Sequence, residues 1–137
     1  GLYRDLAVGV NSGGSDTWGR ESLFALGARV GAPPDEFNPR GQDWGLPPWV
    51  PSALRAERYA PFVEALRANM RHAGALRIDH AMGLMRLFWV PPQAQPEHGT
   101  YVHYPLSDLA GIVALESVRQ RCVIVGEDLG TVAPAMT

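Results

Sequence analysis

The sequence predicts an α/β fold in which parallel strands alternate with helices. Three short apolar runs indicate buried strands, and two amphipathic segments of helical length lie between them. Such an order requires parallel, right-handed crossover connections. Each run ends in polar or Gly-rich residues, which in a barrel would build the face that carries active sites. Part of a (β/α)8 TIM barrel therefore fits better than an open sheet.

Five elements are expected in chain order: a strand at 6–10, a helix at 61–72, a strand at 75–79, a helix at 107–121 and a strand at 122–128. Pro61 suits the first turn of a helix, and Gly74 can close that helix. Ser107 or Asp108 is the expected cap of the second helix.

A long segment, residues 11–60, interrupts this alternation and shows no clear period. A connection of this length inside a compact domain is usually functional or disordered. Phe37, Trp44 and Trp49 argue against disorder, because disordered segments are poor in aromatic residues. We expect an ordered loop region.

Composition excludes several classes of function. The 137 residues are 46% hydrophobic and carry a net charge of −2, which provides no basic surface for nucleic acid. The one cysteine, Cys122, excludes an intrachain disulfide and any multi-cysteine metal site. No apolar run reaches the length of a membrane span, and no basic-then-apolar start indicates secretion. We expect a soluble, cytoplasmic protein with no membrane partner.

The stretch ALRIDH places two charges in a buried-strand pattern. Side chains alternate along a strand, so Ala75, Arg77 and Asp79 share one face while Leu76 and Ile78 share the other. In a barrel, Asp79 would point inward at the C-terminal end of its strand, where catalytic groups lie. Arg77 would favour the ionised carboxylate, as a nucleophile requires. A structural ion pair at a strand end is the alternative.

Glu127 reaches an equivalent position by the same alternation, on the face of Val123 and Val125. Retaining glycosidases and transglycosylases use two carboxylates about 5–5.5 Å apart, one as nucleophile and one as proton donor. We expect no cation beside Glu127, so that a desolvated, sugar-filled pocket keeps the donor protonated. The alternative is a solvated acidic strand end or a helix cap.

A metal site is the weaker hypothesis. No two histidines have the spacing of metal ligands on one helix. The remaining possibility is a site that combines a histidine with Asp79, Glu127 or Asp128. The four histidines are His72, His80, His98 and His103. We expect no metal and no cofactor.

Aromatic residues in the loops suit the apolar faces of sugars. The candidates are Phe37, Trp44, Trp49, Phe88, Trp89, Tyr101 and Tyr104. Trp44 is the best ligand candidate because its surroundings are rich in Gly and Pro, whereas Phe88 and Trp89 are expected in the core. Asp35 and Gln42 could supply hydrogen bonds to a ligand.

Together these motifs resemble amylomaltase, the bacterial 4-α-glucanotransferase or disproportionating enzyme of glycoside hydrolase family 77, a relative of the α-amylases. The matching pieces cover essentially the whole chain: GLYRDLAVGV, GAPPDEFNPRGQDWGLPPW, RANMRHAGALRIDHAMGLMRLFWVP, YVHYPLSDL and VIVGEDLGTV. The resemblance implies a (β/α)8 barrel, of which residues 1–137 would be a central segment with about the third to fifth strands.

The resemblance also implies roles for individual residues. Asp79 would be the nucleophile that forms a covalent glucosyl-enzyme, and Glu127 the general acid/base. Arg77 would orient and ionise Asp79, and His80 would contact the donor sugar. Members of the family transfer α-1,4-glucan segments between maltodextrins, with maltose or glucose among the partners, and need no cofactor.

Residues 11–60 would include the lid over the acceptor side of the cleft, with Asp35, Gln42 and Trp44 as glucan contacts. The third catalytic carboxylate of the family would lie beyond this chain, so we expect the isolated chain to be inactive. A retaining α-glucan hydrolase of the α-amylase clan and a non-catalytic glucan-binding segment are the alternatives.

Overall fold

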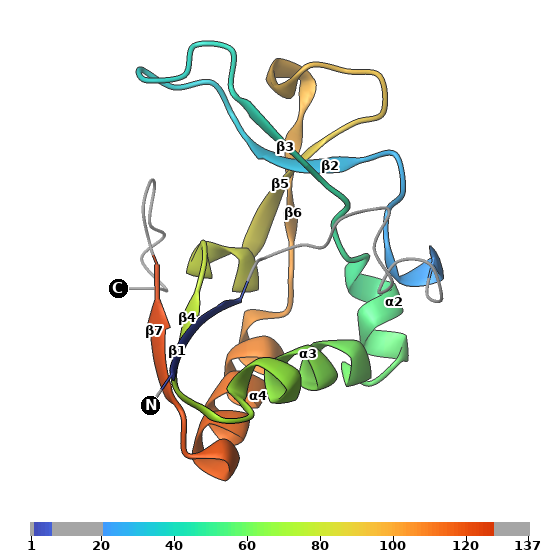
Figure 1. The fold of residues 1–137 in the computed structure, drawn as a ribbon. Coiled ribbons are helices and arrows are strands. Elements are labelled where there is room, and N and C mark those ends of the chain that lie inside the picture. The colour runs from blue at the N-terminus through green and yellow to red at the C-terminus, as the bar shows by residue number, and fades with distance from the viewer. Residues whose placement is uncertain (1, 7–20, 128–137) are drawn as a thin grey trace. The chain divides into compact units, whose positions relative to one another are not determined.

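The computed structural model describes residues 2–6 and 21–127, and these residues form two compact units (Figure 1). The first unit comprises Gly1–Val8, Leu54–Met85 and Pro105–Thr137. The second unit comprises Gly9–Ala53 and Arg86–Tyr104.

The first unit contains a parallel sheet with the strand order β1-β4-β7. Its elements are β1 (Leu2–Leu6), α3 (Ala60–Met70), β4 (Ala73–Ile78), the 3-10 helix η2 (Ala81–Leu84), α4 (Leu106–Gln120) and β7 (Val123–Gly126). Helix α2 (Pro51–Ala56) precedes α3 and begins in the second unit. Helices α3 and α4 occupy the two crossover connections between these strands, so the predicted strand–helix alternation is confirmed.

The core of the first unit lies between the sheet and its helices. Leu76 and Ile78 of β4 are buried, and α3 packs against β1, β4 and α4. The buried residues of α3 fall on one face at helical spacing, and they include Phe62, Leu66 and Met70. One face of β4 is thus committed to apolar packing, which leaves the opposite face for polar side chains.

One charged residue is buried among the apolar residues of α4. The side chain of Glu116 is only 2% exposed and accepts two hydrogen bonds of 3.1 Å from Arg67 of α3. Arg119 adds a contact of 3.4 Å. Because a buried carboxylate must be paired, this interaction fixes α4 to α3.

The second unit is an antiparallel sheet with the order β3-β2-β5-β6, in a region where we expected mainly loop. Its elements are the 3-10 helix η1 (Glu21–Leu23), β2 (Arg29–Ala32), β3 (Gln42–Leu46), β5 (Arg86–Val90), the 3-10 helix η3 (Pro96–His98) and β6 (Thr100–His103). Strands β2 and β3 lie within residues 11–60, so that segment is more regular than predicted. These strands are short and lie among Gly and Pro residues, which hides their period.

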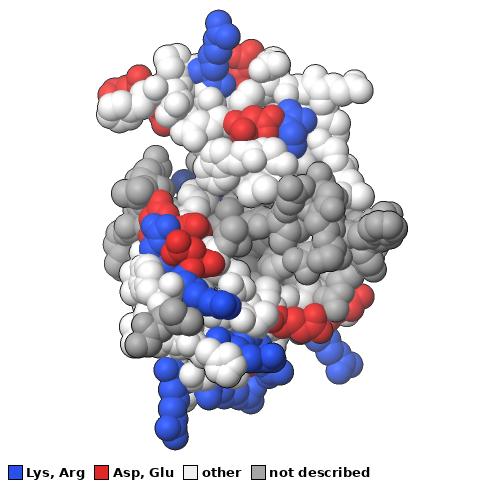
Figure 2. Space-filling model, viewed as in Figure 1, with Lys and Arg blue, Asp and Glu red and all other residues white. Residues whose placement is uncertain are grey.

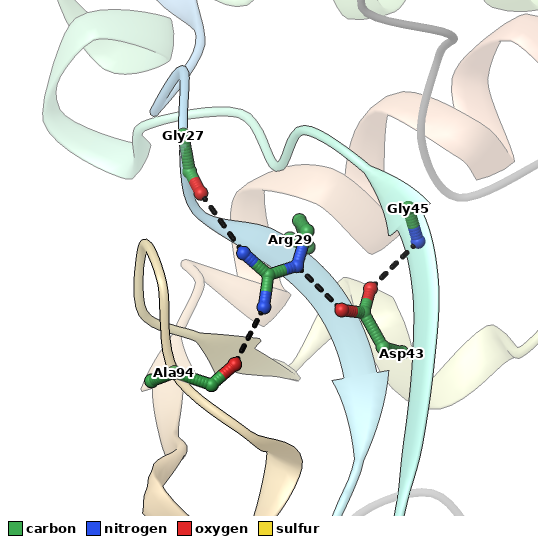
Figure 3. A network of polar contacts seen from close by, with 5 residues as sticks. All are labelled: Gly27, Arg29, Asp43, Gly45 and Ala94. Atoms are coloured by element: carbon green, nitrogen blue, oxygen red, sulfur yellow. Dashed lines mark hydrogen bonds and ion pairs between the residues drawn. The ribbon is translucent and has the colours of Figure 1, made fainter.

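Arg29 links three segments of the second unit (Figure 3). Its guanidinium donates to the carboxylate of Asp43 on β3, to the carbonyl of Ala94 at 2.8 Å and to the carbonyl of Gly27 at 3.4 Å. The other oxygen of Asp43 accepts from the amide of Gly45. The ion pair therefore joins β2 to β3 and to the connection that follows β5.

Several predicted element ends are wrong. The first strand is Leu2–Leu6 rather than 6–10, of which residues 7–10 lie outside the described part. Gly74 does not close α3: His72 takes the left-handed conformation there, with φ 65°, and Gly74 lies inside β4.

The expected cap of the second helix is also wrong. The N-cap of α4 is Pro105, with no side-chain cap. Asp108 instead accepts a hydrogen bond of 2.6 Å from the hydroxyl of Tyr59, so a contact between distant segments has replaced local capping.

Candidate active site

The C-terminal ends of β1, β4 and β7 bring the polar residues of the first unit together. In the parallel register, Arg77 pairs with Asp5 on one side and with Val125 on the other, so the three strands present matching faces. The ladder extends one residue further, because the amide of Asp79 donates to Leu6 and that of Glu127 to Ile78. In space-filling view, acidic and basic side chains gather over these strand ends (Figure 2).

Arg77 is the centre of this cluster. Its Nε donates to Oδ1 of Asp5 at 2.8 Å, its Nη2 lies 2.7 Å from Oδ1 of Asp79, and its Nη1 donates to Oε2 of Glu127 at 3.3 Å. Each nitrogen of the guanidinium thus has its own carboxylate. Because Asp79 and Glu127 bind the two terminal nitrogens of one planar group, their carboxylates face the same small region.

The expectation that no cation lies beside Glu127 is therefore wrong. The prediction considered the neighbours of Glu127 in sequence, whereas Arg77 approaches it across the sheet. The same cation contacts both candidate carboxylates. The contacts of Arg77 therefore do not show which of the two carboxylates is the charged nucleophile and which is the protonated donor.

Asp5 is a member of the cluster that the sequence analysis missed. The first strand was expected to begin at Leu6, which left Asp5 outside it, whereas Asp5 is the last but one residue of β1. The sequence gives little signal for this strand, because β1 reads LYRDL and the apolar run that follows it predicts a strand at 6–10 instead. Arg77 hydrogen bonds to this carboxylate and lowers the pKa of Asp5 below its usual value.

His80 follows Asp79 in an unusual conformation. Its φ and ψ are 54° and 62°, in the left-handed region that costs energy for a residue with a Cβ. This turn directs the amide of Ala81 to the carbonyl of Glu127 at 2.7 Å, so the segments after β4 and β7 are joined. Burial lowers the pKa of His80, and the charge of Glu127 opposes that shift in part.

In the second unit, Gln42 and Trp44 lie on one face of β3. Both are half-buried, and Nε1 of Trp44 donates to Oε1 of Gln42 at 3.0 Å. Asp35 lies apart from them in a turn, where its Oδ1 accepts from the amides of Phe37 and Asn38. Phe37 is 89% exposed at this turn, which leaves its ring open to a ligand or another segment.

The other aromatic candidates contribute mainly to packing. Phe88 is buried, as expected, and meets Tyr101 edge to face, while Trp89 is only half-buried. Tyr104 is buried and donates its hydroxyl to the carbonyl of Trp49, and burial raises its pKa. Tyr104 is thus a core residue rather than a sugar platform.

Two further findings concern the described residues alone. No group of three or more His, Cys, Asp or Glu side chains among them is arranged to hold a metal ion. Within the same ranges, no helix has both the length and the apolar character needed to cross a membrane.

Comparison with known proteins matches residues 1–137 to a family model described as 4-alpha-glucanotransferase. The chain belongs to the 4-alpha-glucanotransferase family. It is 52% identical to the 4-alpha-glucanotransferase of Haemophilus influenzae over 132 residues, which are 96% of this chain and 19% of that protein. It is 54% identical to the 4-alpha-glucanotransferase of Mycobacterium bovis over 134 residues, which are 98% of this chain and 18% of that protein.

Solved structures agree with this 4-alpha-glucanotransferase assignment. The crystal structure of amylomaltase from Corynebacterium glutamicum superposes with a TM-score of 0.93 at 47% identity, over 97% of this chain and 19% of that one. Amylomaltase from Streptococcus agalactiae, in complex with acarbose, gives a TM-score of 0.86 at 20% identity, over 97% of this chain and 28% of that one, and supports the fold alone. The chain thus spans about a fifth of the length of the 4-alpha-glucanotransferases of Haemophilus influenzae and Mycobacterium bovis.

Proposed function

We propose that this chain is the part of a 4-alpha-glucanotransferase that carries the nucleophile and the general acid/base. The observation that carries the proposal is that Arg77 contacts Asp79 and Glu127 at once, at the ends of adjacent parallel strands. Together with membership of the family, this geometry favours a reaction centre over an isolated ion pair.

The reaction would proceed by two displacements with retention of configuration. Asp79 attacks the anomeric carbon of the donor sugar, and the bond to the leaving 4-oxygen breaks as Glu127 gives that oxygen a proton. In the second step, the carboxylate of Glu127 takes the proton of an acceptor 4-hydroxyl. That oxygen then attacks the anomeric carbon and releases Asp79.

The contact between Arg77 and Glu127 bears on the first step. A donor must carry a proton, whereas a neighbouring guanidinium favours the anion. At 3.3 Å this contact is the longest of the three that Arg77 makes. We therefore expect bound glucan to loosen it and to desolvate Glu127, while Arg77 stays with Asp79.

The proposal extends to the whole protein. Residues 1–137 would be the third to fifth strands of a (β/α)8 barrel, and residues 11–60 would include a lid in which Asp35, Gln42 and Trp44 contact the acceptor glucan. His80 would contact the donor sugar. The third carboxylate would come from a later strand, so the isolated chain would be inactive. Maltodextrins, maltose and glucose are the expected partners, in the cytoplasm.

The test compares variants of the full-length protein with maltotriose as the substrate. Glu127→Gln removes the proton donor, so transfer should fall by about 10²–10⁴-fold. An α-maltosyl fluoride donor should restore the first step in this variant, because fluoride leaves without a proton. Asp79→Asn should lose activity with both donors, since no covalent intermediate can form.

Glu57→Gln is the matched control, because Glu57 is an exposed carboxylate of the first unit outside the cluster. It should leave activity unchanged. Near-normal transfer by Asp79→Asn would overturn the assignment. Longer maltodextrins together with glucose indicate transfer. Products that are all shorter than maltotriose would instead indicate a hydrolase.

A further inference from the structure

Asp5 meets Arg77 at a position fixed by the sheet. The two residues are paired in the parallel register of β1 and β4, and Oδ1 of Asp5 accepts from Nε of Arg77 at 2.8 Å. Since paired residues of parallel strands share a face, the backbone alone places this carboxylate beside the guanidinium.

Asp5 binds Nε of Arg77, and this fixes the whole guanidinium because the group is rigid. Its three nitrogens lie in one plane, so holding Nε in place sets the directions of Nη1 and Nη2. Nη2 meets Asp79 and Nη1 meets Glu127. Without a partner for Nε, the arginine could rotate about its last bonds and leave one or both carboxylates.

The position of the pair favours a role in the site. Arg67 and Glu116 form a buried pair that joins two helices. Asp5 and Arg77 instead lie at the C-terminal ends of paired strands, where the same arginine contacts both candidate carboxylates.

We propose that Asp5 is a positioning residue that holds Arg77 in the orientation in which it contacts Asp79 and lies within reach of Glu127. The inference rests on the proposed function, because it assigns Asp5 a part in the same reaction. Asp5 itself needs no contact with the glucan. Its effect on catalysis passes through Arg77.

The test uses Asp5→Asn and Asp5→Glu in the full-length enzyme with maltotriose. For Asp5→Asn we expect kcat to fall by about 10–100-fold, as for a small misplacement of catalytic groups. KM and the melting temperature should change little. Loss of one negative charge favours ionisation of the remaining carboxylates, so the basic limb of the pH profile of kcat/KM should move to lower pH. Asp5→Glu keeps the charge and should recover part of kcat.

A double-mutant cycle with Arg77→Met separates positioning from an independent effect. Once Arg77 is absent, Asp5→Asn should cause no further loss of activity. An equal loss in both backgrounds would overturn the inference, as would normal kcat and an unchanged pH profile in Asp5→Asn. Loss of folding in both Asp5 variants would also overturn it, since the role would then be structural.

The two proposals fail in different ways. Activity that survives Asp79→Asn or Glu127→Gln contradicts the proposed reaction itself. If those variants are inactive while Asp5→Asn remains normal, only the positioning role is wrong. Glu57→Gln again serves as the control of equal charge change in the first unit.

Discussion

The buried pair of Arg67 and Glu116 should be asymmetric in its contribution to stability. Glu116 is 2% exposed, whereas Arg67 is 49% exposed, so removing either partner leaves the other in a very different environment. Arg67→Met removes two hydrogen bonds and leaves a buried carboxylate with Arg119 alone, which should cost about 3–5 kcal/mol. Glu116→Gln leaves a half-exposed arginine that water can solvate and should cost about 1–2 kcal/mol.

The contribution of this pair to the free energy of unfolding should decrease at low pH. Hydrogen bonding to Arg67 lowers the pKa of Glu116, so the folded state binds this proton less readily than the unfolded state. The pair's contribution is therefore complete above about pH 5 and is lost as the pH falls through the lowered pKa. The difference in stability between the wild type and Arg67→Met should therefore become smaller as the pH falls.

Urea denaturation of the full-length protein measures these differences, and amide hydrogen exchange in α3 and α4 assigns them to this pair. The double variant Arg67→Met/Glu116→Met should regain much of the loss, because well-packed apolar residues can replace a buried ion pair. Equal costs for the two single variants, or a larger cost for Glu116→Gln, would refute the argument from burial.

Further predictions concern the cluster and the second unit. Arg77→Lys keeps a positive charge but not the planar fork, so kcat should fall by about 10²-fold with the melting temperature nearly unchanged; wild-type kcat would contradict the shared-guanidinium geometry. Gly41→Ala should destabilise by about 1–3 kcal/mol in thermal denaturation, because Gly41 has φ +76° and an added Cβ would lie 2.7 Å from backbone oxygen. Trp44→Ala should raise KM for the acceptor about 2–10-fold while donor hydrolysis persists, as expected for a lost stacking contact.

The sequence indicates the parallel part of the fold because its elements are local. Strand β4 is mostly apolar and α3 has a helical period, so these elements can be located without knowledge of their partners, whereas the first strand lies at Leu2–Leu6 and not at 6–10. The face of Arg77 and Asp79 follows from alternation alone. The end of α3 is not visible in the sequence: the helix ends at Met70, and His72, a residue with a side chain, takes the left-handed conformation for which we expected Gly74.

The remaining features depend on contacts between strands. Strand β2 has four residues, and its pairing with β3 shifts register between Val30 and Gly31, so no period is visible in the sequence. The contact between Arg77 and Glu127 and the presence of Asp5 depend on the register of β4 with its two neighbours. Alternation gives the face of a side chain, but only the register gives its partner.

The second sheet draws its strands from two separate connections. Strands β2 and β3 come from the segment between β1 and α3, and β5 and β6 from the segment between β4 and α4. The pairing of β2 with β5 joins the two segments edge to edge. A chimera that exchanges only one of these segments with a relative would therefore pair a native strand with a foreign one at β2 and β5, so we expect the second sheet to stay intact only when both segments are exchanged together.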